Sequence, residues 1–261
     1  MKIMKLAIQR INNQIRHDFA FTLIESARFQ NWVSRENNRV EIRYENTEMD
    51  DNDIVKPFEF KNKFYGSYIP IGSVEFVTQH LQEFHGLTPK PQNVPTSLFP
   101  YAYRRILNGT EEGVQSAVDE YNRTFVKSND VIKGFQEVFK KGMDVGDIPK
   151  GNYQISNSIN IDSEWRSFIY KGKLVGLQHY VGEFTLFPNV RVIKHMIEVY
   201  EASKEAPIAY TLDIGINDQG TFVIEVHDFF SCGLYGFSNH AILPQMFGRW
   251  YTEYVNKNKI K

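Results

Sequence analysis

The sequence predicts an α+β protein, in which helices and antiparallel strands form separate groups. From residue 124 onward the patterns read strand, helix, strands, helix and hairpin, without the regular alternation of a parallel α/β sheet. Of the 261 residues, 42% are hydrophobic and 14% aromatic, which is enough for a packed core. We therefore expect one large or two small globular domains.

Charge and cysteine content exclude several classes of protein. The formal net charge of −1 gives no global positive field, so neither nucleic acid nor an anionic membrane is an expected partner. Cys232 is the single cysteine, which excludes an internal disulfide and predicts a reducing compartment. The N-terminal residues lack the apolar core of an export signal, and no eighteen apolar residues run together. We therefore expect a cytoplasmic protein without a membrane segment.

The first part of the chain mixes helix and strand patterns. Apolar residues at helical spacing favour a helix over residues 19–29, and residues 41–44 favour a strand. The acidic residues 45–53 predict a solvated loop. A second βα unit follows, with a strand over 67–71 and a helix that Ser73 is suited to cap.

Prolines mark the best candidate for a boundary between two lobes. Residues 88–100 contain four prolines, which predict an extended connection rather than a helix or a strand. We therefore divide the chain into an N-terminal α/β region, 1–100, and a second region, 101–261. In the second region the apolar positions 192, 193, 196, 197 and 200 predict a helix that packs one face on a sheet.

Two lysines flank a turn after the strand predicted over residues 124–127. Lys127 ends this strand, and Lys133 follows six residues later, so both side chains can contact the same phosphate group. The alternative is a pair of ordinary surface lysines. No GxxxxGK[ST] or GxGxxG motif occurs, so a P-loop or Rossmann site is not supported.

A strand with alternating charged residues follows. Glu164 and Arg166 share one face of this strand. A turn at residues 171–173 leads into a second strand, which returns beside the first and carries Gln178. An arginine next to a carboxylate is suited to stabilise charge on a transferring phosphoryl group. Glu164 and Gln178 are further candidates for nucleotide contacts, and the backbone of residues 155–161 is suited to hydrogen-bond an adenine edge. The alternative is a cross-strand ion pair on an exposed sheet.

The hairpin predicted over residues 210–228 carries candidate metal ligands. Two β-branched and aromatic runs are joined by a turn at residues 217–220. The two-residue period of a strand places Asp213, Glu225 and His227 on a common face. Carboxylates converging from neighbouring strands suit Mg²⁺, which completes its shell with water and nucleotide phosphates. The alternative is a half-solvated sheet whose outward positions are acidic.

Five short motifs follow one another along the second region: TFVK at 124–127, KGF at 133–135, EWRSFI at 164–169, LDI at 212–214 and VIEVHD at 223–228. Their order is that of ATP-grasp enzymes, and the chain resembles that superfamily. With IPIGSVEFV at 69–77 and GLYG at 233–236, the motifs look like the R2K clade, known from bacteria and bacteriophages. A more distant likeness is to the eukaryotic cell-division-cycle ATP-grasp proteins that assist assembly of a translation initiation factor.

The resemblance implies an ATP-grasp fold with ATP bound between antiparallel sheets of two α+β lobes. It implies that Lys127 and Lys133 contact the phosphates and that Arg166 meets the γ-phosphate. It also implies that Asp213 and Glu225 bind Mg²⁺. The chain departs from the family where an Asn is usual, two residues after the metal-binding Glu.

At that position the chain has His227, followed by Asp228. An imidazole is a softer ligand than an amide oxygen, which puts the second Mg²⁺ site in doubt. Asp228 is the candidate substitute.

Such enzymes typically phosphorylate a carboxylate to an acylphosphate, which an amine then attacks. The resemblance therefore implies an ATP- and Mg²⁺-dependent ligase that joins a carboxylate substrate to an amine acceptor, with a peptide or protein terminus as one candidate. The alternative is an ATP-binding assembly factor or inhibitor that uses ATP as a conformational switch. The sequence does not identify either substrate, because pockets in this superfamily are built from variable loops.

Overall fold

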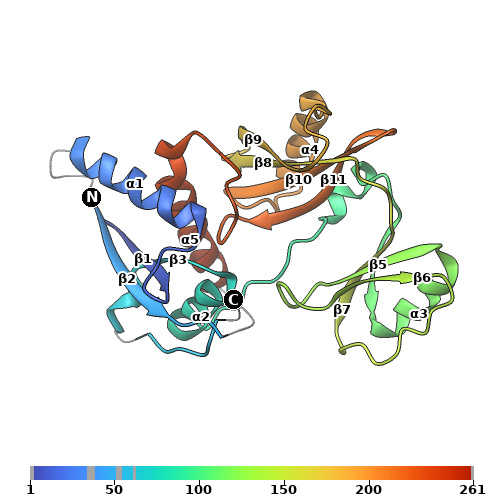
Figure 1. The fold of residues 1–261 in the computed structure, drawn as a ribbon, viewed down its shortest axis with the longest axis horizontal. Helices are drawn as coiled ribbons and strands as arrows, with labels where there is room; N and C mark the ends of the chain where they lie inside the picture. Colours follow the sequence, from blue (N-terminus) through green and yellow to red (C-terminus); the bar gives the residue numbers. More distant parts are fainter. Residues whose placement is uncertain (1–2, 34–38, 51–54, 61–62, 260–261) are drawn as a thin grey trace. The chain divides into compact units, whose positions relative to one another are not determined.

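The computed structural model describes residues 3–33, 39–50, 55–60 and 63–259 (Figure 1). The contacts divide the chain into two compact units, and each is described by itself. The first unit contains Met1–Thr88, Pro207–Ala209 and Asp228–Lys261, and the second contains Pro89–Ala206 and Tyr210–His227. The expected regions 1–100 and 101–261 divide the chain along the sequence, whereas contacts return its last 34 residues, 228–261, to the first unit.

The first unit is built on a three-stranded parallel sheet with the order β2-β1-β3. Its strands are β1 (Met4–Ile11), β2 (Val40–Thr47) and β3 (Ile69–Ile71). Its helices are α1 (Asp18–Val33), α2 (Val74–His85) and α5 (Leu243–Lys259), with short 3-10 turns η1 (Lys63–Ser67) and η3 (His240–Ile242). The predicted helix over 19–29 and the βα unit are confirmed, and the Ser73 side chain caps α2 by accepting from the Phe76 amide.

The expected acidic loop over residues 45–53 is wrong at its start. Glu45 lies inside β2 and is only 4% exposed, because this strand pairs with β1 along its whole length. Residues 51–53 of that loop lie outside the described part of the chain. Parallel pairing with β1 therefore decides the structure at Glu45, where the local charge pattern predicted a loop.

The second unit contains two four-stranded sheets. The larger has the order β11-β10-β8-β9, from β8 (Ser163–Tyr170), β9 (Lys173–Gly182), β10 (Ala209–Asn217) and β11 (Gly220–Asp228). The smaller has the order β4-β7-β5-β6, from β4 (Ile106–Thr110), β5 (Arg123–Ser128), β6 (Gln136–Lys140) and β7 (Asn152–Asn157). The smaller sheet is antiparallel at all three pairings, as expected for an α+β protein.

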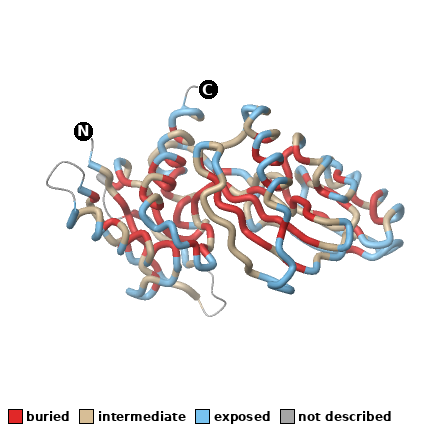
Figure 2. Tube along the Cα trace, turned by 90° about the horizontal axis from the view of Figure 1, so that it is seen from above, coloured by how far each residue is buried: buried red, intermediate tan, exposed pale blue. Residues whose placement is uncertain are grey.

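Each sheet of the second unit has its own helix and its own core. Helix α4 (Val190–Ala202) packs the buried residues Ile193, Met196, Ile197 and Tyr200 on the larger sheet, which confirms the predicted face. Helix α3 (Glu111–Glu120) packs Val114, Ala117 and Val118 on the smaller sheet. The 3-10 turn η2 (Thr96–Tyr101) contributes Leu98 to the core of the larger sheet. Buried residues follow the strands in Figure 2, and exposed ones follow the outer helix faces.

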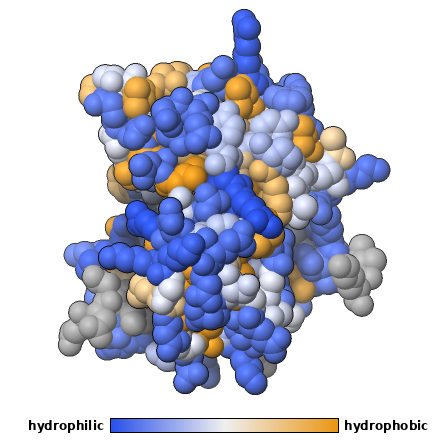
Figure 3. Space-filling model, turned by 90° about the vertical axis from the view of Figure 1, so that its right-hand side faces the viewer, coloured by the Kyte–Doolittle hydropathy of each residue, from blue (hydrophilic) through white to orange (hydrophobic). Residues whose placement is uncertain are grey.

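The predicted turns are confirmed. Lys171 and Gly172, with φ of 51° and 66°, join β8 to β9, and this pair of left-handed residues matches the twist of a two-residue hairpin. Gly220, with φ of 122°, is the last residue of the turn predicted at 217–220 and the first residue of β11. The surface in Figure 3 is largely hydrophilic, with apolar residues in scattered patches. None of the described helices has both the length and the apolarity needed to cross a bilayer.

Candidate functional site

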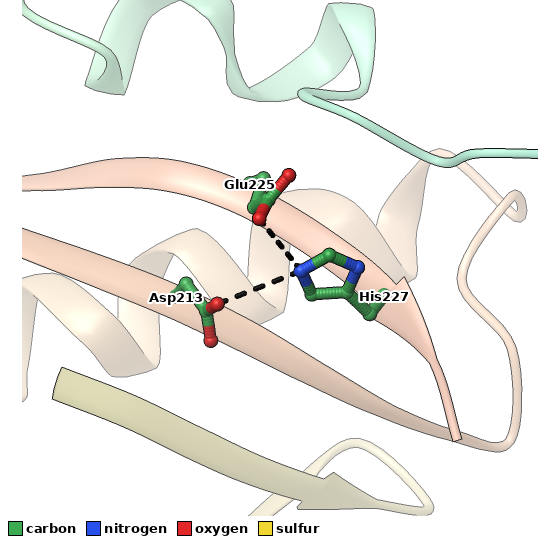
Figure 4. A group of neighbouring side chains, drawn as sticks. All are labelled: Asp213, Glu225 and His227. Carbon is green, nitrogen blue, oxygen red and sulfur yellow. Dashed lines mark ion pairs between the residues drawn. The ribbon is translucent and has the colours of Figure 1, made fainter. Parts of the chain in front are cut away.

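Three side chains of the β10–β11 hairpin converge on one face of the larger sheet (Figure 4). The Nε2 atom of His227 lies 2.8 Å from Oε1 of Glu225 and 3.5 Å from Oδ2 of Asp213. One potential ligand atom from each residue lies within 4.8 Å of the other two. The common face expected from strand alternation is therefore present, and these atoms can share one metal ion.

Cations from two other strands pair with the two carboxylates. Arg166 on β8 binds Asp213 through both oxygens, with Nε–Oδ1 at 2.8 Å and Nη2–Oδ2 at 2.7 Å. Lys127 on β5 pairs with Glu225, which brings a residue of the smaller sheet to the hairpin. Arg166 is 8% exposed and Asp213 is 2% exposed, so their pairing offsets the desolvation of both charges.

These contacts shift the pKa values of Asp213, Glu225 and His227, which together form the hairpin cluster. Burial opposes ionisation of Asp213, but hydrogen bonds from Arg166 and His227 outweigh it and lower the pKa of this carboxyl group. Burial likewise opposes ionisation of Glu225, whose pKa is lowered by His227 and Lys127. Burial disfavours the charged form of His227, but the neighbouring carboxylates raise the pKa of this imidazole to about 9. The cluster therefore consists of charged groups at neutral pH.

Glu164 and Gln178 flank Arg166 on the same pair of strands. The Tyr180 hydroxyl donates to Oε2 of Glu164 at 2.7 Å, and the Arg166 guanidinium lies 5.7 Å from the centre of the Tyr180 ring. Gln178 is opposite Arg166 in the β8–β9 register. Tyr180 was not predicted from the sequence, since it lies at a register shift of the β8–β9 pairing, between the partners of Glu164 and Trp165.

Lys133 and Asp228 do not belong to the group of three converging side chains. Lys133 is exposed in the loop between β5 and β6, with a left-handed φ of 55°. Asp228 accepts a hydrogen bond from the Trp250 indole at 2.9 Å and is not one of the three converging ligands. Strand alternation turns Asp228 away from the face that His227 occupies. Their roles in phosphate and metal binding stay predictions.

Two neighbouring cavities lie beside the cluster within the second unit. A polar cavity of about 150 Å³ is lined by Asn93, Arg104, Phe125, Lys127, Gln136, Gln154, Ser156, Ile224 and Glu225. A more apolar one of about 200 Å³ is lined by Arg104, Phe125, Ile224 and residues 156–159 and 161. The two share the lining residues Arg104, Phe125, Ser156 and Ile224, so they adjoin each other, with the charged residues Lys127 and Glu225 lining only the first.

Arg104 is the main residue that the sequence did not reveal. Its guanidinium donates to the carbonyl oxygens of Val223 at 2.9 Å and Ile224 at 2.8 Å, which fixes it against β11. Burial lowers its pKa to about 10. Arg104 has no recognisable motif around it, and only the tertiary structure brings it to both cavities.

The family of the chain follows from a comparison with family models. The model for the ATP-grasp domain, R2K clade family 2, matches residues 101–244, which is more than half of the chain. The chain belongs to this family. The R2K resemblance expected from the motifs is thereby confirmed.

Solved structures confirm the ATP-grasp fold of this R2K-clade protein. It is similar to D-cycloserine synthetase DcsG, at 11% identity and a TM-score of 0.56 over 94% of this chain and 98% of that one. It is similar to N5-carboxyaminoimidazole ribonucleotide synthetase from Thermotoga maritima, at 14% identity and a TM-score of 0.54 over 94% and 76%. It is also similar to D-alanine–D-alanine ligase from Bacillus anthracis in complex with ATP, at 12% identity and a TM-score of 0.51 over 97% and 99%.

At these identities the likeness establishes the fold alone. Two of the three similar structures are named synthetases and one is named a ligase. None of the curated proteins compared with the chain matches it.

Proposed function

We propose that this R2K-clade protein is an ATP- and Mg²⁺-dependent ligase that joins a carboxylate substrate to an amine through an acylphosphate. The observation that carries the proposal is the meeting of Asp213, Glu225 and His227 beside Arg166 and Lys127. Two carboxylates and several cations within one unit are suited to hold a polyphosphate together with its metal. Solved ATP-grasp proteins of the same fold are named ligases and synthetases, which supports this reaction class.

The neighbouring cavities support ATP as the nucleotide. Their apolar part, with Phe125, Ile161 and Ile224, is suited to a purine base, since ligand pockets are mainly apolar with few polar groups. Their polar part contains Lys127 and Glu225 and suits the phosphates. Residues 156–159 line the apolar part, and they belong to the stretch 155–161 whose backbone is predicted to contact an adenine edge.

The residues present fit a divalent cation. Each carboxylate oxygen has two lone pairs, so Asp213 can accept from Arg166 and still bind a metal ion. Asp213 and Glu225 supply the hard oxygen ligands that Mg²⁺ takes. His227 would add a nitrogen ligand once a metal ion displaces the proton that its imidazole carries at neutral pH. When bound there, the cation would supply positive charge that offsets the negative charge of the transferring phosphoryl group.

The chemistry needs positioning rather than a protein nucleophile. The substrate carboxylate attacks the γ-phosphorus, the bond to the bridging oxygen of ADP breaks, and an acylphosphate forms. The amine then attacks the carbonyl carbon, the bond to phosphate breaks, and the amide is released after the amine loses a proton. Arg166, held in place by Asp213, is preorganised to stabilise charge on the transferring group.

Trapping of the acylphosphate tests this proposal. The protein is incubated with ATP, Mg²⁺, hydroxylamine and pools of carboxylates that include peptides, and hydroxamate and ADP are measured. We expect carboxylate-dependent formation of both products, lost in Asp213→Asn and retained in Asp218→Asn, a change of an exposed carboxylate in the same hairpin. ATP binding without any ADP or hydroxamate would overturn the ligase reaction in favour of an ATP-binding assembly factor or inhibitor.

A further inference from the structure

Asn93 connects the two sheets of the second unit. Its side-chain Nδ2 donates to the Ser128 carbonyl oxygen at 2.9 Å and to Oδ1 of Asn129 at 2.6 Å. Its own carbonyl oxygen accepts from the Val226 amide at 2.7 Å. Ser128 ends β5 in the smaller sheet, whereas Val226 lies in β11 of the larger sheet. One residue therefore binds both sheets with different groups.

Both contacts fall next to residues of the proposed site. Lys127 directly precedes Ser128, and the loop that carries the second proposed phosphate contact begins after it. Val226 lies between Glu225 and His227. Glu225 and His227 share one face of β11, because side chains alternate along a strand and Val226 lies between them. A hydrogen bond to the Val226 amide therefore restrains the backbone from which both side chains project.

Other bonds hold the surrounding segment in place without the Asn93 side chain. Gln154 donates to the Val94 carbonyl at 3.0 Å and accepts from the Val94 amide at 3.1 Å. Lys90 pairs with Asp130 at 3.1 Å, and Asp130 also accepts from the Asn152 amide at 2.7 Å. Removal of the Asn93 side chain should therefore act locally, on the contact with Ser128 and Asn129.

Asn93 has two features that oppose folding. Its φ of 46° is left-handed, a conformation that glycine adopts most readily and asparagine at a small cost. The residue is 2% exposed, and its Oδ1 atom has no hydrogen-bond partner among the described residues. Such costs concentrate at functional sites, and Asn93 lines the polar cavity together with Lys127 and Glu225.

We propose that Asn93 is a positioning residue. It holds the β5–β6 loop against β11, the strand that carries the proposed metal ligands Glu225 and His227, so that a nucleoside triphosphate contacts both elements. This inference rests on the proposed function, because it assigns the loop to the phosphates and the strand to the metal. A triphosphate contacts the loop and the strand, so its binding depends on their relative position. A nucleoside without phosphates contacts neither element. Asn93 should therefore affect phosphate binding and leave base binding unchanged.

The substitution Asn93→Gly tests this inference. Glycine accepts the left-handed φ and keeps the carbonyl that binds Val226, but it lacks the Nδ2 donor. The control is Asn13→Gly, since Asn13 is exposed and has a φ of 64° in the first unit. Affinities for ATP with Mg²⁺ and for adenosine are measured by calorimetry. We expect ATP to bind about tenfold more weakly, as for one or two lost hydrogen bonds, and adenosine to change less than about twofold.

An unchanged ATP affinity, or an equal loss for ATP and adenosine, would overturn the positioning role. If the parent protein binds no ATP, the proposed function fails, and hydrogen exchange still tests the contact itself. Amides of residues 129–135 should exchange faster in Asn93→Gly than in the parent and in Asn13→Gly. Unchanged exchange in this loop would show that the side chain does not hold it, and would overturn the inference by a route that needs no nucleotide.

Discussion

At the scale of single residues, substitution of Arg166 tests whether the site catalyses phosphoryl transfer or only binds ATP. Arg166→Lys keeps the charge but loses the planar fork that spans both oxygens of Asp213. We expect single-turnover ADP formation to fall by about 10², the effect of losing one preorganised donor, and ATP affinity to change little. Weaker ATP binding with an intact chemical step would instead make Arg166 a ground-state phosphate clamp. If neither quantity moves, Arg166 has only a structural role.

The two hairpin carboxylates are predicted to make nucleotide binding depend on metal. Asp213→Asn and Glu225→Gln keep the shape of each side chain but remove the charge of a proposed ligand. We expect both variants to lose the Mg²⁺-dependent part of ATP affinity, measured by titrations with and without the ion, while circular dichroism reports a folded chain. Asp218→Asn is the matched control. MgATP binding equal to that of the parent would mean that the hairpin is only structural.

His227 is predicted to set the metal preference of the site. An imidazole nitrogen suits Zn²⁺ better than Mg²⁺, whereas an amide oxygen does not discriminate in this way. We expect His227→Asn to weaken Zn²⁺ binding by about tenfold or more and Mg²⁺ binding much less, as measured by calorimetry without nucleotide. An unchanged ratio of the two affinities would exclude His227 as a direct ligand.

At the scale of elements, helix α2 contains a buried histidine that should make the protein sensitive to acid. His80 is fully buried, and burial lowers its pKa from 6.5 to about 4, while its Nε2 atom bonds the Tyr65 carbonyl at 2.8 Å. The unfolded chain therefore takes up this proton near pH 6.5, and the folded chain only near pH 4. His80 therefore contributes about 3 kcal/mol to the free energy of unfolding above pH 6.5, and this contribution is lost as the pH falls toward 4.

The test compares denaturant unfolding of parent and variant between pH 7 and pH 4. His80→Phe keeps an aromatic ring next to Phe60 and Phe84, so the variant should lose less stability than the parent over this interval. His195→Gln, at an exposed position of α4, should keep the acid sensitivity of the parent. Equal pH dependence in parent and His80→Phe would contradict the assignment to His80.

At the scale of the whole molecule, ATP with Mg²⁺ should raise the melting temperature. A ligand that binds only the folded state stabilises it by about 2.7 kcal/mol at one hundred times its dissociation constant. The shift should require both ATP and Mg²⁺ and should be reduced in Glu225→Gln. No shift at millimolar ATP, together with no signal in a direct binding assay, would remove the nucleotide proposal.

Local patterns determined much of the fold. The helical spacing of apolar residues predicted α4 and its buried face, the Ser73 cap predicted the start of α2, and turn residues predicted both hairpins. Strand alternation also brought Asp213, Glu225 and His227 to one face, because all three lie on a single hairpin with a short turn. The order of short motifs was enough to predict the family and hence the fold.

Only the tertiary structure decided which residues complete the site. Arg166 lies beside Asp213, 47 positions away in the chain, because β8 pairs with β10, and Lys127 reaches Glu225 from a different sheet. Glu45 became a buried strand residue, and Arg104 and Asn93 became cavity residues, although neither the charge pattern nor any motif marked them. The physical reason is the sequence separation over which each interaction acts. Periodicity, caps and turns depend on a few neighbouring residues, so the sequence by itself determined them. Strand order and sheet-to-sheet contacts depend on residues far apart in the chain, and they were decided by the packing of the whole fold.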